Sequence, residues 1–122
     1  MHMGDGRILV VDDEAAIRET VSEMLDLEGY EVETASNGAE ALKAVEREFP
    51  AIVLLDMRMP VLDGWGFAGA MRDRGIGVKI VVMTAARDAE RWAREISANG
   101  YLAKPFGFDD LVSTIQQVQA EP

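Results

Sequence analysis

Three short runs of consecutive apolar residues constrain the fold of this chain more than any other feature. They occupy residues 8–11, 51–55 and 80–83. A run without polar interruptions suits a strand that is buried on both faces of a parallel sheet, because a half-exposed strand would alternate apolar and polar side chains. The three runs therefore predict the central strands of such a sheet.

After the first run, the apolar residues change to helical spacing. Ile17, Val21, Met24 and Leu25 lie on one stripe of a helix, which Gly29 can terminate. This change of period predicts a helix that packs one face against the sheet.

Four further helices are predicted along the chain. The apolar spacing predicts helices at 38–48, 88–99 and around 111–118. A helix at 65–74 is predicted only weakly, because its Gly66 and Gly69 each cost about 1 kcal/mol relative to Ala.

Two more strands complete the pattern. In residues 30–34 the side chains of Tyr30, Val32 and Thr34 alternate with two glutamates, which predicts an edge strand with one wetter face. Residues 101–103 form a last short strand. Five strands that alternate with five helices predict an α/β fold whose sheet is covered on both faces.

The length and charge of the chain limit its organisation and partners. Its 122 residues favour one domain, which we place at 7–119, and residues 1–6 are expected to be a tag or a flexible N-terminus. The net charge of −10 disfavours nucleic acid and anionic membrane surfaces, because both are bound through clustered Lys and Arg. No apolar stretch is long enough to span a membrane, and the lack of cysteine excludes disulfides, which fits a cytoplasmic protein.

Polar residues follow the predicted strands directly, at Asp12-Asp13, Asp56, Thr84 and Lys104. In a parallel α/β sheet these carboxyl ends meet at one edge, where ligands bind. Three carboxylates and one ammonium group leave a net charge of −2, so the cluster needs a cation to stay ionised. An oxygen-only set of ligands suits Mg²⁺, with Mn²⁺ as an alternative, better than zinc.

Together with the residues that flank them, these polar positions resemble the receiver domain of two-component response regulators. The resemblance rests on five motifs in order: Val10-Val11-Asp12-Asp13-Glu14, Leu55-Asp56-Met57-Arg58-Met59-Pro60, Asp63-Gly64, Met83-Thr84-Ala85, and Tyr101-Leu102-Ala103-Lys104-Pro105-Phe106. It implies a flavodoxin-like, doubly wound sheet of five parallel strands in the order 2-1-3-4-5, with five helices.

The resemblance also implies a phosphorylation site, with Asp56 as the phospho-acceptor. Asp13, Asp56 and the backbone carbonyl of Arg58 would coordinate Mg²⁺ directly, and Asp12 would act mainly through bound water. Lys104 would contact the phosphoryl oxygens and precede a cis peptide bond to the next residue.

A switch is implied as well. Thr84 would also contact the phosphoryl group, and Tyr101 would turn inward as Thr84 moves. This would change the surface formed by the fourth helix, the fifth strand and the fifth helix.

The implied partners follow from this role. A histidine kinase or a phosphotransfer protein would supply the phosphoryl group, and the chain would catalyse only its own phosphorylation and dephosphorylation. The signal would pass to a downstream protein or to an output domain missing from this chain, and phosphorylation could drive dimer formation. No direct contact with nucleic acid or membrane is expected.

Two rival functions come from other classes. Gly64, Gly66 and Gly69 match the dinucleotide-binding glycine pattern, but residues 56–63 separate them from the preceding strand. A metal-dependent phosphatase that works through an aspartyl phosphate would need a second acid two positions after Asp56, where the chain has Arg58.

Two features depart from the family pattern. Ser97 stands where many members have Gly, and Trp65 with the glycines that follow it begins the third helix unusually. Neither departure involves the predicted phosphorylation residues.

Overall fold

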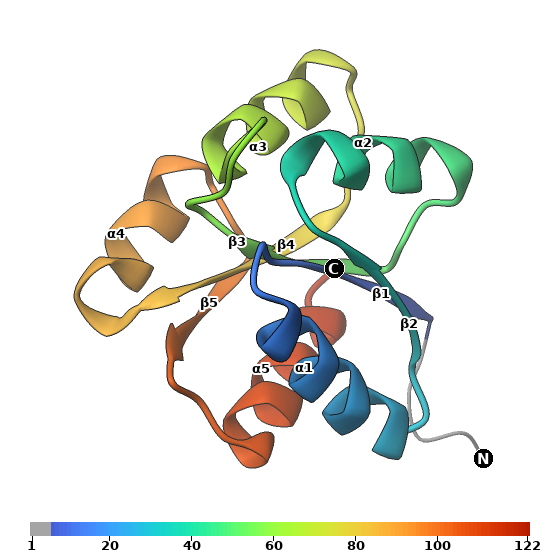
Figure 1. The fold of residues 1–122 in the computed structure, drawn as a ribbon, viewed down its shortest axis with the longest axis vertical. Helices are drawn as coiled ribbons and strands as arrows, with labels where there is room; N and C mark the ends of the chain where they lie inside the picture. The colour runs from blue at the N-terminus through green and yellow to red at the C-terminus, as the bar shows by residue number, and fades with distance from the viewer. Residues whose placement is uncertain (1–5) are drawn as a thin grey trace.

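The computed structural model describes residues 6–122, which form a central sheet with helices on both sides (Figure 1). All strand pairs are parallel and their order is β2-β1-β3-β4-β5. The strands are β1 (Arg7–Val11), β2 (Glu31–Ala35), β3 (Ile52–Asp56), β4 (Lys79–Ala85) and β5 (Gly100–Lys104). The helices within the described residues are α1 (Ala15–Leu27), α2 (Gly38–Arg47), α3 (Gly64–Asp73), α4 (Ala86–Glu95) and α5 (Phe108–Ala120). The predicted fold class and strand order are confirmed.

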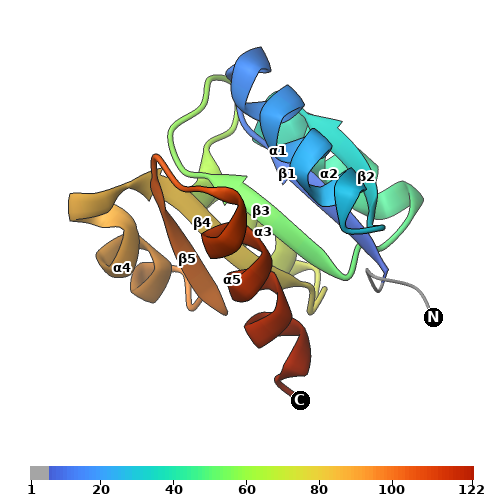
Figure 2. The ribbon, with the colours of Figure 1, turned by 90° about the horizontal axis from the view of Figure 1, so that it is seen from below.

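The central strands are buried on both faces, which explains their uninterrupted apolar runs. In β1, Ile8 and Val10 pack on the side of α1 and α5, whereas Leu9 and Val11 pack on the side of α2, α3 and α4. Figure 2 shows α1 and α5 lying together over one face of the sheet. The four apolar residues of β1 therefore alternate between two apolar cores.

Helix α1 ends where its sequence predicts. The amide of Gly29 donates to the carbonyl of Asp26 at 3.0 Å, and the amide of Tyr30 donates to that of Leu25 at 3.1 Å. Gly29 has a φ of 88°, a left-handed conformation that glycine adopts without steric cost. The turn leads the chain directly into β2.

Helix α3 forms in spite of its glycines. At its start, the Asp63 side chain accepts a hydrogen bond of 2.8 Å from the amide of Gly66. Phe67 and Met71 are buried against α2 and the sheet. A side-chain cap contributes about 1 kcal/mol and each large buried side chain about 2 kcal/mol, which offsets the cost of two glycines.

The predicted bounds of the fourth helix were wrong. Instead of 88–99, α4 spans Ala86–Glu95. Ser97 has a φ of 56°, and the amide of Ala98 donates to the carbonyl of Ala93 at 2.8 Å, so the chain turns out of the helix here. Glycine suits this left-handed position better than serine, which explains the family preference at Ser97.

The exposure predicted for the edge strand was also partly wrong. β2 does lie at the edge of the sheet, but Thr34 is exposed and Glu33 is half-buried. Glu33 turns inward because it forms ion pairs with Arg7 and Arg47. The ion pairs of Glu33 therefore override the expected alternation of inward apolar and outward polar side chains along β2.

Val61, in the loop between β3 and α3, has a strained backbone. Its φ is 71°, which a β-branched residue rarely adopts, and its side chain is 81% exposed. We expect Val61→Gly to stabilise the fold by about 1 kcal/mol, because the strain that it relieves exceeds the conformational entropy that glycine adds to the unfolded chain, and no buried contact is lost. Urea unfolding measures the change, with Val61→Ala as the control that should gain little. Equal stabilisation by both variants would contradict the assignment of strain.

Two further features concern the length of the helices and the N-terminal segment. No helix in residues 6–122 combines the length and the apolar character needed to cross a membrane. The tag or flexible segment predicted for residues 1–6 lies, apart from Gly6, outside the described residues.

Candidate functional site

Three carboxylates meet at the carboxyl edge of the sheet. Asp12 and Asp13 follow the last residue of β1, and Asp56 is the last residue of β3, the strand that pairs with β1. One oxygen of each carboxylate lies within 4.8 Å of the others. The topology therefore brings together the three aspartates that the sequence predicts.

Lys104, the last residue of β5, provides the positive charge of the site. Its Nζ lies 2.8 Å from Oδ2 of the fully buried Asp12 and 3.8 Å from Oδ1 of Asp56. Burial alone would lower the pKa of Lys104, but the hydrogen bond to Asp12 and the nearby negative charges raise it overall. Lys104 therefore stays protonated and faces the two buried carboxylates.

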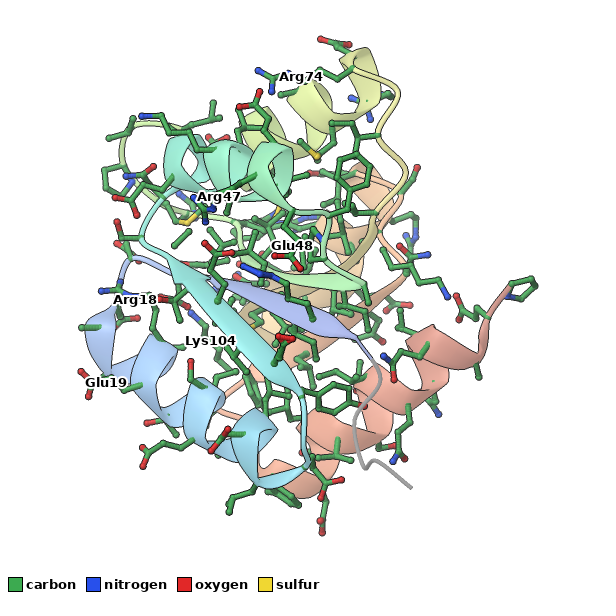
Figure 3. All side chains as sticks on the ribbon, turned by 90° about the vertical axis from the view of Figure 1, so that its right-hand side faces the viewer. Arg18, Glu19, Arg47, Glu48, Arg74 and Lys104 are labelled. Carbon is green, nitrogen blue, oxygen red and sulfur yellow. The ribbon has the colours of Figure 1, made fainter. Side chains whose placement is uncertain are left out.

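Backbone and side-chain contacts hold Asp12 in place. Its Oδ1 accepts a hydrogen bond of 2.9 Å from the amide of Glu14, and its carbonyl accepts one of 2.8 Å from Arg18. Figure 3 shows Arg18 and Glu19 on α1 at the edge of the molecule, with Lys104 further in. The contact of Arg18 was not predicted, although its position one helical turn after Glu14 is a signal that could have pointed to it.

Asp56 has the most perturbed carboxyl group of the site. Burial, and next the charge of Asp12, raise its pKa to about 7, although Lys104 and the amide of Arg58 partly oppose the rise. The residue is only 6% exposed. A cation beside Asp56 would favour its ionised form, which is the nucleophilic form.

The loop after β3 is held close to the strand end. The amide of Gly64 donates to the carbonyl of Met57 at 3.0 Å. A Cβ added at Gly64 would lie 2.8 Å from Cα of Met57 and 3.0 Å from the carbonyl oxygen of Asp56. Only glycine fits here, which explains the Asp63-Gly64 motif without any role in nucleotide binding.

The donor set fits a hard divalent cation. Asp13 is exposed to solvent, whereas Asp12 and Asp56 are buried, so the cluster is open on one side. Mg²⁺ favours such a site because it keeps several waters and uses few carboxylates. Burial and, next, the charge of Asp12 raise the pKa of Asp56, and a cation bound here would oppose both effects.

The two predicted switch residues lie on neighbouring strands. Thr84 is buried in β4, one residue beyond the partner of Asp56 in the strand register. Tyr101, in β5, is 45% exposed and therefore lies in the outward position from which the expected switch would begin. The Lys104-Pro105 peptide bond is cis, as the resemblance implies. The switch itself stays a prediction.

The rival functions are not favoured. Gly64, Gly66 and Gly69 lie inside α3, and Gly66 faces Leu62. The side chain of Arg58, where a phosphatase would carry its second acid, lies over the ring of Trp92.

Comparisons with known proteins agree with this geometry. The family model described as the response regulator receiver domain matches residues 8–116. A probable transcriptional regulator, ycf27, from Pyropia yezoensis is 43% identical over 114 residues, which are 92% of this chain and 46% of that protein. The response regulator MprA from Mycobacterium leprae (strain TN) is 42% identical over 113 residues, which are 90% of this chain and 49% of that protein. The chain thus spans about half the length of these curated relatives.

Solved structures show the same fold. The chemotaxis response regulator CheY4 of Vibrio cholerae superposes with a TM-score of 0.85 at 34% identity, covering 94% of this chain and 99% of that chain. A putative response regulator from Chloroflexus aurantiacus gives a TM-score of 0.89 at 30% identity, covering 97% and 100%. The acidic cluster, the fold and these likenesses together identify the chain as a member of the response regulator receiver domain family.

Proposed function

We propose that this receiver domain accepts a phosphoryl group on Asp56 from a phosphohistidine of a kinase or a phosphotransfer protein, and that Mg²⁺ supports the transfer. The observation that carries the proposal is the buried Asp56 carboxylate, which lies beside Asp12, Asp13 and Lys104 and has a pKa of about 7. We propose residues 7–119 as the domain and Asp12, Asp13, Asp56 and the Arg58 carbonyl as the metal site.

The transfer is an in-line displacement. A carboxylate oxygen of Asp56 forms a bond to phosphorus while the bond between phosphorus and the histidine nitrogen breaks, and its electron pair stays on the imidazole. Mg²⁺ bound to the carboxylates would neutralise charge on the transferred group. Lys104, at 3.8 Å from Asp56, is positioned to meet a phosphoryl oxygen. The group that accepts the phosphoryl group is Asp56 of the chain itself. The chain would therefore catalyse only its own phosphorylation and dephosphorylation.

A groove beside the site offers a place for the phosphodonor. It encloses about 460 Å³ between α1 and the segment after β5, and its lining includes Ile17, Met24, Lys104 and Phe106. The segment 12–31, which contributes the α1 part of this lining, contains eight acidic residues and one basic residue, a net charge of −7. We expect the donor to present an apolar centre with a basic rim.

The output is proposed to pass through Thr84 and Tyr101 to the surface of α4, β5 and α5. The receiver of a longer regulator would act on its own output domain, and a separate receiver would act on a downstream protein or form a phosphorylation-dependent dimer. The relatives named as transcriptional regulators support the first route. We propose a cytoplasmic location and no direct contact of this domain with nucleic acid or membrane.

The switch can be separated from phosphorylation by one variant. Two charge-assisted contacts from Thr84 and Lys104 to the phosphoryl group would supply about 2 to 5 kcal/mol, enough to invert a minor state of a few per cent. Thr84→Ala should keep phosphorylation but lose most of the amide shifts of α4 and β5 in NMR spectra. Wild-type shifts in the phosphorylated variant would contradict the switch.

The proposed function is tested with a small phosphodonor. Incubation with acetyl phosphate and Mg²⁺ should add one phosphoryl group by intact-mass measurement, and a chelator should prevent the addition. Asp56→Asn should stay unlabelled. Asp63→Asn should be labelled, because the Asp63 carboxylate of the wild type lies in the same loop but caps α3. Unchanged labelling of Asp56→Asn would refute the assignment.

A further inference from the structure

A stack of aromatic and cationic side chains joins the loop after β3 to helix α4. The guanidinium carbon of Arg58 lies 5.0 Å from the ring centroid of Trp92. The Trp92 ring contacts that of Trp65 edge to face, with centroids 4.9 Å apart, and Nε1 of Trp65 donates to Glu95 at 2.9 Å. The stack therefore joins the loop after β3 and the first turn of α3 to one turn of α4.

Arg58 belongs to both the stack and the candidate metal site. Its amide hydrogen-bonds to the Asp56 carboxylate, and its carbonyl is one of the proposed metal ligands. The Arg58 side chain is exposed, whereas Trp92 is only 6% exposed. The exposed Arg58 side chain is therefore packed against the buried ring of Trp92.

We propose that Arg58 is a positioning residue: its stacking on Trp92 holds the Arg58 peptide in the geometry that binds the cation. This inference rests on the proposed metal site and adds a link from that site to α4 that does not pass through Thr84 and Tyr101. A cation–π contact at a partly exposed site is strong enough to change an affinity about two- to five-fold. Because such coupling is reciprocal, cation binding should tighten the stack in turn.

The effect of stacking on the Mg²⁺ affinity can be distinguished from the effect of the Arg58 charge. Removing a positive charge near a cation site should strengthen cation binding, whereas removing the stack should weaken it. Arg91 provides the matched control, because its guanidinium carbon lies 5.9 Å from the centroid of the same Trp92 ring but belongs to α4 and pairs with Asp88. Arg58→Ala and Arg91→Ala thus remove equal charge close to the same ring.

The experiment is a Mg²⁺ titration followed by the NMR shifts of the backbone amides of residues 57–59 and 61–64. Arg58→Ala should weaken Mg²⁺ binding about two- to five-fold. Arg91→Ala should keep or slightly strengthen it, and Trp92→Phe, which keeps an aromatic face, should fall between wild type and Arg58→Ala. In a Trp65→Phe background, Mg²⁺ should change the fluorescence of Trp92, and Arg58→Ala should abolish that change.

The outcomes separate this inference from the proposed function. If the wild type binds no Mg²⁺, the proposed metal site is wrong, and this inference is wrong with it. If the wild type binds Mg²⁺ and Arg58→Ala binds it equally or more tightly, only the positioning role is overturned. An equal loss in Arg91→Ala would also overturn it, because that result would reflect a general disturbance of α4.

Discussion

Asp56→Asn is expected to stabilise the metal-free protein by about 2 kcal/mol at pH 8. Asp56 has a pKa of about 7 in the fold against an ordinary value of 3.8, so ionisation at pH 8 opposes folding. A pKa difference of this size would be worth about 4 kcal/mol in a fully enclosed site, and the solvent exposure of the neighbouring Asp13 reduces it. The amide of Asn has a similar shape and no charge to desolvate.

The stability gained by Asp56→Asn should increase with pH. The folded chain binds a proton at Asp56 more tightly than the unfolded chain, so the contribution of this group to stability is present below pH 4 and is lost as the pH rises through 7. Urea unfolding at pH 5 and pH 8 should therefore show a larger gain at pH 8. Asp26→Asn, an exposed change on α1, is the matched control and should alter stability little. Equal gains at both pH values would contradict the origin of the effect.

Asp13→Asn is expected to weaken Mg²⁺ binding at least about ten-fold. Loss of outer-shell partners already costs about 10- to 100-fold in metal affinity, and a direct carboxylate ligand should cost no less. Asp13 is exposed, so its replacement should leave the fold intact. Titration followed by NMR measures the change. Glu14→Gln, which removes the same charge from the next residue outside the cluster, should bind nearly as the wild type does. Wild-type affinity in Asp13→Asn would remove this residue from the proposed ligands.

The parts of the fold that could be predicted are those set by local pattern. The run at 8–11 indicated a strand buried on two faces, and β1 contributes to both apolar cores. Gly29 marked the end of α1 and has the expected left-handed backbone. These signals depend only on residues close in sequence, so the sequence alone was sufficient.

The parts that could not be predicted depend on contacts between distant residues. Glu33 is drawn inward by Arg7 and Arg47, which come from another strand and from a helix. The bounds of α4 depend on Ser97 in a conformation that serine rarely adopts. No local pattern signals either feature.

The candidate site shows the same division. Asp12, Asp13, Asp56 and Lys104 could be placed together because the carboxyl ends of parallel strands share one edge. The stacking of Arg58 on Trp92 could not be foreseen, because it depends on how the loop after β3 lies against α4. The sequence therefore predicts which groups meet at the sheet edge but not what holds them in place.

Chemical trapping locates the phosphoryl group in the sequence and so tests Asp56 as its acceptor. After treatment with acetyl phosphate and Mg²⁺, borohydride reduces an aspartyl phosphate to homoserine, which peptide mass spectrometry can place in the sequence. We expect homoserine at position 56, and only when Mg²⁺ and the phosphodonor are both present. Homoserine at Asp12, Asp13 or another aspartate, with position 56 unchanged, would contradict it.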